Sequence, residues 1–266
     1  MPCRLFHPYH IFQLEKHNRH LTPCLPLPPV YPTNSCLFPS DYSHVSLPRY
    51  TLSDALAVSI FLGVFIRQSQ HLGMCNIAQS LNVISPLLTD PSDPSAPLLK
   101  QTTFYPYLLF SRLMRGHTLA VHLRCQEFTG SMVAGESPDR RNYGWLRGLS
   151  RTPWLYVSAC VGVGTEELAA PEARRMGGVK FQEADARYVC VAVTNVHEEK
   201  AFEVEFEVEG LKGKEVRTFT VGGQGTGPWV SNTRKKEEVG VVEGTWKAQG
   251  SYEFPPLSLT LLRWKL

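Results

Sequence analysis

Acidic side chains are the groups in this sequence with the chemistry to break a covalent bond, because a carboxyl group can act as general acid, general base or nucleophile. The most regular acidic pattern is a ladder of alternate glutamates, Glu203, Glu205, Glu207 and Glu209. Each alternates with an apolar residue, so all four are expected on one wet face of a strand. A working carboxyl pair needs surroundings that push its two pKa values apart. A solvated row of like charges does not provide them, and the ladder is predicted to be structural.

Acids are sparse in the first half of the chain. No other glutamate lies between Glu15 and Glu127, and the acids in that interval are Asp41, Asp54, Asp90 and Asp93. We expect Asp54 in the first turn of a helix, where a negative charge is favourable beside the helix dipole. The other three fall in proline-rich stretches that resemble loops. The positions of these four acids therefore favour structural roles.

Histidines and cysteines are the next candidates, as metal ligands. The one set that suggests itself, His17, His20, Cys24 and Cys36, fits no common zinc spacing. The seven cysteines are odd in number, widely spread and without a C-x-x-C pair, which gives little support for a zinc ribbon or a disulfide framework. We predict no metal site and no cofactor. Cysteines inside apolar runs are expected to be buried, inert thiols, namely Cys75, Cys160 and Cys190.

The remaining polar and aromatic candidates are interpreted as structural. Three histidines lie in or beside predicted strands with no acid at motif spacing, namely His117, His122 and His197. Large aromatic residues can stack on sugars, but in a sandwich they usually fill the core or cover an edge. This interpretation applies to Trp154, Trp229, Trp246 and Trp264. The glycine-rich run at 222–225 lacks the strand-to-helix context of a phosphate loop and is interpreted as a turn.

Composition places the chain among ordinary globular proteins, since 43% of its 266 residues are hydrophobic and 19% are charged. The formal net charge of +3 is too small to indicate a nucleic-acid or membrane partner. The longest apolar stretch, residues 55–66, is well short of the roughly 20 residues that a membrane-spanning helix needs. The first residues lack the apolar segment of a secretory signal, and the sequence leaves the compartment open.

The composition and the hydrophobic pattern of the sequence change at residue 50. Residues 1–49 hold many prolines and five of the nine histidines, so we expect a disordered leader outside the fold. A helix is expected from Ser53, as its N-cap, to a stop at Gly73. An apolar strand over residues 76–84, a loop over 85–100 and a second helix over 103–115 follow. This helix, strand and helix order over residues 50–116 is typical of an α/β fold.

From residue 117 to 266 the pattern changes to that of antiparallel sheets. Short alternating segments separated by glycine-rich turns predict a β-sandwich of jelly-roll type, so the fold class is mainly β. The expected strands cover residues 118–123, 154–161, 188–196, 202–209, 216–221, 238–242 and 257–264. A polar stretch at 162–178 interrupts them and is expected to hold one short helix.

Several separate motifs, in order, carry a resemblance to a known family. They are S-D-A-L-A-V at 53–58, N-I-A-Q-S-L-N-V-I-S-P-L at 76–87, M-R-G at 114–116, T-N-V-H at 194–197 and S-L-T-L-L-R-W-K at 258–265. Together they resemble the fungal branch of glycoside hydrolase family 51, the α-L-arabinofuranosidases, over residues 50–266. The resemblance implies a (β/α)8 barrel followed by a β-sandwich. Residues 50–116 would then be a barrel remnant, made of the last strand and its flanking helices.

The resemblance also implies a retaining glycosidase chemistry, which needs two carboxyl groups about 5–5.5 Å apart. In the family both catalytic glutamates lie upstream of the helix that begins near Ser53, and no acid of this chain matches either motif. We therefore predict no catalytic residue in this chain. The family's last barrel strand brings the glutamine of its I-A-Q motif close to arabinose, and Gln79 matches it. Asn82, in the same motif, is a second substrate-binding candidate.

Three interpretations of function remain open at this point. The first is an inactive fragment of an arabinofuranosidase-type protein that acts on terminal arabinofuranosides of hemicellulose. The second is a stand-alone, non-catalytic carbohydrate-binding or scaffold sandwich. The third is a hydrolase with relocated catalytic acids. By resemblance, the expected partner is an arabinose-substituted polysaccharide or oligosaccharide.

Overall fold

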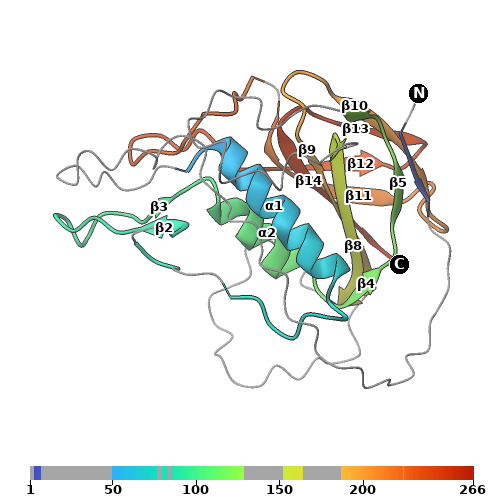
Figure 1. The fold of residues 1–266 in the computed structure, drawn as a ribbon, viewed down its shortest axis with the longest axis horizontal. Helices are drawn as coiled ribbons and strands as arrows, with labels where there is room; N and C mark the ends of the chain where they lie inside the picture. Colours follow the sequence, from blue (N-terminus) through green and yellow to red (C-terminus); the bar gives the residue numbers. More distant parts are fainter. Residues whose placement is uncertain are drawn as a thin grey trace, which may run out of the picture.

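The computed structural model describes residues 3–6, 50–76, 80–82, 85–128, 152–163, 187–223 and 225–266. Within these ranges the protein is a layered arrangement of two β-sheets and a pair of helices (Figure 1). Helices α1 (Leu52–Arg67) and α2 (Phe104–Leu113) lie side by side over one face of the larger sheet. The smaller sheet lies on the opposite side. The architecture confirms the expected mainly β sandwich.

The larger sheet has six strands and is antiparallel throughout, in the order β12-β11-β14-β9-β8-β4. β14 and β9 occupy its centre, with eight consecutive residue pairs in register from Ser258↔Asn195 to Lys265↔Tyr188. The strands span β4 (His117–Leu119), β8 (Leu155–Val163), β9 (Arg187–Asn195), β11 (Glu215–Gly222), β12 (Val241–Lys247) and β14 (Ser258–Lys265).

The smaller sheet has four strands in the order β13-β10-β1-β5. Its strands are β1 (Cys3–Phe6), β5 (His122–Arg124), β10 (Phe202–Glu207) and β13 (Ser251–Phe254). The backbone of β1 runs parallel to β10 and antiparallel to β5. Residues 3–6 therefore belong to a sheet, in contrast to the leader outside the fold that was expected. The rest of residues 1–49 lies outside the described residues.

Two short ribbons complete the strand inventory of the described residues. β2 (Leu87–Leu88) pairs with β3 (Leu99–Lys100) in the segment that connects α1 to α2, and β6 (Glu127–Phe128) pairs with β7 (Thr152–Pro153). The expected insertion at 162–178 lies outside the described residues from position 164 onward.

Two apolar cores lie on the two faces of the six-stranded sheet. One forms between this sheet and the helices and contains Leu56, Leu109 and Leu261. The other forms between the two sheets and contains Val191, Val204 and Trp264. β10 shows the expected alternation, since Phe202 and Val204 are buried while Glu203 and Glu207 are exposed. Alternate residues of β10 thus face the inter-sheet core and the solvent.

The start of α1 is tied to a distant loop. Thr51 is the N-cap and forms a capping box with Asp54, whose Oδ2 accepts from the Thr51 backbone nitrogen at 2.7 Å. The next two helix N–H groups donate outside the helix, Leu52 to the carbonyl of Val230 and Ser53 to that of Pro228. The expectation of Ser53 as N-cap was wrong, because Thr51 occupies that position, and the Ser53 hydroxyl donates to the Pro228 carbonyl instead.

Three other expectations about elements differ from the structure. The strand expected at 118–123 is broken, with β4 in the larger sheet and β5 in the smaller one. The strand expected at 238–242 begins only at Val241. Within the segment 76–84, the described residues Asn76 and 80–82 form no strand, and Asn82 has a positive φ of 60°. The other residues of that segment lie outside the described ones.

Close backbone contact holds the end of the helical pair against the sheet. Gly162 of β8 lies against the turn that follows α2, and a Cβ at this position would meet the Gly116 Cα at 2.7 Å and overlap the Arg115 carbonyl. Gly116 itself has φ +108°, a conformation that side chains rarely adopt. The glycine pair therefore permits an approach that no other residue type allows.

We expect Gly162→Ala to lower the free energy of unfolding by about 2–4 kcal/mol, because backbone on both sides of the contact would have to shift. Gly73→Ala is the matched control, since nothing lies within 4 Å of a Cβ placed there. Urea denaturation followed by circular dichroism measures both. Equal stability of the two variants would contradict the close contact.

Candidate functional site

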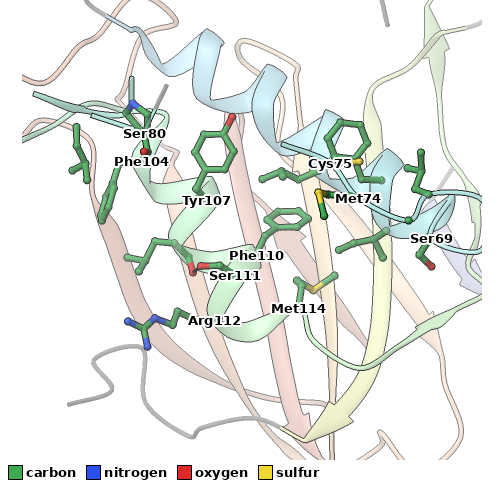
Figure 2. Close-up of a pocket in the computed structure, with 18 residues that line it drawn as sticks. Ser69, Met74, Cys75, Ser80, Phe104, Tyr107, Phe110, Ser111, Arg112 and Met114 are labelled. Atoms are coloured by element: carbon green, nitrogen blue, oxygen red, sulfur yellow. Dashed lines mark hydrogen bonds between the residues drawn. The ribbon is translucent and has the colours of Figure 1, made fainter. Parts of the chain in front are cut away.

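A groove of about 750 Å3 runs between the two helices and the segment that follows α1 (Figure 2). α1 supplies Leu62, Phe65 and Ile66 to its lining. Tyr107 and Phe110 of α2 project toward it, and Met74 and Cys75 lie across from Phe110 in Figure 2. Among the described residues, the polar side chains of the lining include Ser69, Ser80, Ser111 and Arg112, and none is Asp or Glu. This lining is suited to apolar contact.

Asp54 is a buried acid among the described residues, and its carboxylate is hydrogen-bonded at the start of α1. Its Oδ2 accepts from both the backbone nitrogen and the Oγ1 of Thr51, at 2.7 and 2.8 Å. The carboxylate therefore caps α1 as expected from its first-turn position, and both hydrogen bonds require it to stay an acceptor.

The two loop acids have the wrong electrostatics for a general acid. Hydrogen bonds from Ser92 lower the pKa of Asp90, and hydrogen bonds from Ser95 lower the pKa of Asp93. Arg234 adds to the effect on Asp90, with its Nε 3.4 Å from the carboxylate. A catalytic general acid needs a raised pKa. Both carboxyls serve as acceptors in tight turns, and Asp41 lies outside the described residues.

The glutamate ladder lies on the outer face of β10, as predicted. Glu203 and Glu207 are exposed, and Glu203 accepts a hydrogen bond from Ser251. The register places Glu203 directly opposite Glu253 of β13, so two like charges face solvent together. The exposure of Glu203 and Glu207 supports the structural interpretation of this row.

Of the two predicted substrate-binding residues, only Asn82 lies among the described residues. Gln79 lies outside the described residues. Asn82 holds a turn together: its Oδ1 accepts from the nitrogen and the Oγ1 of Thr89, at 2.8 and 3.0 Å, and its own nitrogen donates to Leu87. An asparagine tolerates the positive φ better than most residues. The structure brings Asn82 next to β2 and gives its oxygen a local role, and sugar binding by either residue remains a prediction.

Two of the three candidate histidines, His117 and His122, are exposed, whereas His197 and most of the tryptophans are embedded in the fold. The Nδ1 of His197 accepts from the backbone nitrogens of Glu199 and Lys200, and its ring lies 4.5 Å from Trp154, which confirms a structural role. Trp264 is buried in the inter-sheet core and Trp246 packs against it. Trp229 departs from the expectation, since 58% of it is exposed.

The cysteine expectations are confirmed at two positions and wrong at one. Cys160 and Cys190 are buried, whereas Cys75 is exposed beside the groove. Within the described residues, no group of three His, Cys, Asp or Glu side chains is arranged to hold a metal ion. No helix among them is long and apolar enough to cross a membrane.

These features define a helix-covered β-sandwich with an apolar groove, and the described residues contain no reactive acid pair. The profile of the family described as the α-L-arabinofuranosidase C-terminal domain matches residues 36–258. The chain belongs to this family.

Relatives in fungi share the same region. The chain is 45% identical over 216 residues to a probable α-L-arabinofuranosidase C of Aspergillus terreus, covering 81% of this chain and 35% of the relative. The α-L-arabinofuranosidase C of Emericella nidulans is 44% identical with the same coverage. The chain thus spans about a third of the length of the curated relatives it matches.

Solved structures share the fold at lower identity. The α-L-arabinofuranosidase of Thermotoga maritima, solved with arabinose, aligns with a TM-score of 0.60 and 19% identity, covering 82% of this chain and 39% of that one. The family 51 arabinofuranosidase of Xanthomonas axonopodis aligns with a TM-score of 0.59, 18% identity and 85% coverage of this chain, or 38% of that one. These matches show the fold.

The groove is the feature that sequence reasoning did not assign as a site. The helices carry apolar residues on this side: Phe61, Phe65 and Leu108 are half-buried, and Phe65 and Leu108 line the groove. Their other sides pack on the six-stranded sheet.

We expect Asn82→Ala to speed hydrogen exchange at the Thr89 amide at least tenfold, because that amide loses its acceptor and alanine is strained at a positive φ. Asn82→Asp keeps an acceptor oxygen and is the control, with exchange close to the parent chain. NMR exchange rates measure the difference. An unchanged Thr89 rate in the alanine variant would show that the Asn82 side chain does not hold this turn.

Proposed function

We propose that this chain is the C-terminal structural domain of an α-L-arabinofuranosidase-type protein and does not itself hydrolyse arabinofuranosides. The proposal is based on the structural roles and pKa shifts of the acidic side chains. Three acids lie in or near the segments that resemble the family. Asp54 caps a helix, and Asp90 and Asp93 are turn residues whose pKa values are lowered. A retaining glycosidase needs a nucleophile and an acid with a raised pKa side by side.

The apolar groove supports a scaffold role for the same domain. An open, carboxylate-free lining built from both helices is the kind of surface that packs against another protein layer. The chain covers only 35% of the A. terreus relative, which leaves a large part of that protein to supply such a layer. The domain then acts by supporting the part of the protein that binds arabinose-substituted substrates.

Carbohydrate binding by the domain alone is the second candidate. The observation that favours it is the exposure of Trp229, which stands on a loop fixed by two hydrogen bonds from α1. A rigidly held, exposed indole ring can stack on a sugar face. Retention of the chain on arabinoxylan, lost in Trp229→Ala and kept in Val242→Ala at another exposed position, would favour this candidate over the scaffold.

The purified chain is expected to release no p-nitrophenol from p-nitrophenyl α-L-arabinofuranoside above the buffer rate. The E. nidulans enzyme serves as the positive control in the same assay. Turnover that co-purifies with the chain and disappears in Asp90→Asn or Asp93→Asn would instead establish relocated catalytic acids.

The scaffold role predicts association with the missing layer. When the chain is co-expressed with the part of the A. terreus relative that precedes the matching region, we expect the two to co-purify. Leu108→Asp should weaken this association at least tenfold, because burying a leucine contributes about 1.5–3 kcal/mol and a buried aspartate is unfavourable. Leu98→Asp changes an exposed leucine outside the groove and should leave the association intact. Equal capture of both variants would remove the groove from the interface.

A further inference from the structure

Two buried cysteines lie side by side on adjacent strands of the larger sheet. Cys160 of β8 and Cys190 of β9 are directly paired residues in the antiparallel register. Their exposed fractions are 3% and 1%, and both belong to the core between the sheet and the helices. Because side chains of directly paired residues project to the same face, the two thiols lie next to each other under the helical layer.

The spacing of such a pair matches that of a disulfide. Directly opposed residues of antiparallel strands have Cα atoms about 4.5 or 5.5 Å apart. Disulfides join residues whose Cα atoms are about 4.4–6.8 Å apart. A bond between these cysteines therefore requires side-chain rotation and little movement of the strands.

We propose that Cys160 and Cys190 form an intramolecular disulfide between β8 and β9 when the chain folds in the presence of a small disulfide such as oxidised glutathione. This inference does not depend on the proposed scaffold function. It concerns covalent modification of the sheet, and neither family membership nor the groove implies it.

The surroundings make both thiols unreactive in the closed fold. Burial raises the pKa of Cys160 to about 12 and raises that of Cys190 as well. At pH 8 only about one Cys160 thiol in ten thousand is then ionised, and the thiolate is the reactive form. The Met114 sulfur, 3.9 Å from the Cys160 Sγ, covers the thiol from the end of α2.

A neighbouring cation opposes the effect of burial. Arg263 of β14 is directly opposite Cys190 in the register, on the side away from Cys160. Its guanidinium lowers the pKa of both thiols, although burial outweighs it. Once the end of α2 moves away and water enters, the burial penalty falls while the guanidinium remains. The thiols then become easier to ionise in the arrangement that a disulfide needs.

The reaction is a pair of thiol–disulfide exchanges. One cysteine thiolate attacks a sulfur of oxidised glutathione, forming a mixed disulfide and releasing one glutathione thiolate. The second cysteine attacks the protein sulfur of that mixed disulfide, forms the Cys160–Cys190 bond and releases the second glutathione. Two electrons pass from the cysteine pair to glutathione, and the two cysteine protons end on the two released thiols.

The test is to refold the full chain from urea in a mixture of oxidised and reduced glutathione, so that access does not limit the reaction. Peptide mapping without reduction should then find the peptides of Cys160 and Cys190 joined. A variant with serine at Cys3, Cys24, Cys36, Cys75 and Cys125 removes competing thiols. In this background the product should be two hydrogen atoms lighter than the reduced chain. Its Tm should be higher by on the order of 5–10 °C, because the bond closes a ring of roughly 30 residues.

Cys160→Ser and Cys190→Ser in the same background are the matched controls, and each should give no joined peptides and no rise in Tm. If the five-serine variant does not fold, peptide mapping of the parent chain still identifies the pair. A refolded chain in which both thiols stay free, carry separate glutathiones or pair with other cysteines would overturn the proposal. A joined pair that lowers Tm would show that the native strands do not accommodate the bond, and would overturn it too.

Discussion

Strand β9 is buried on both of its faces, and the rest of the fold follows from that constraint. Val189, Val191 and Val193 point into the core between the sheets, while Cys190 and Ala192 point toward the helices. A sheet with two apolar faces needs a layer on each side. The four-stranded sheet covers one face, and α1 and α2 cover the other. The helical pair is therefore part of the sandwich's own core.

The same arrangement explains the groove. α1 and α2 turn one side toward the sheet, where Leu56 and Leu109 are buried. Their other sides carry Phe65 and Leu108, which the described chain covers only partly. Helices that are apolar on more than one side normally lie between two layers. The sheet supplies one layer, and relatives more than twice as long have the chain length to supply the other.

Much of this fold could be predicted from local pattern, and the failures have physical causes. The alternation of β10 and the apolar runs of β9 and β14 are local patterns within each strand, so these strands were predicted from the sequence. The break between β4 and β5 was not predicted. The sequence of each of these segments fits a strand, and they are separated only because they pair with different sheets. Trp229 is exposed on a loop whose Pro228 and Val230 carbonyls accept from α1, and these long-range hydrogen bonds have no local sequence signal. The structural role of Asn82 depends on Thr89, seven residues away, which no motif marks.

The origin of α1's first hydrogen bonds has a consequence for the order in which the chain folds. Leu52 and Ser53 donate to carbonyls some 175 residues later in the chain, and Thr102 donates to the Thr51 carbonyl. During synthesis the beginning of this helix emerges long before its acceptors exist. A ribosome adding about 5–20 residues per second leaves it without them for roughly ten seconds or more. The helix that covers the sheet thus receives its final anchoring late, after residues 228–230 have joined the fold.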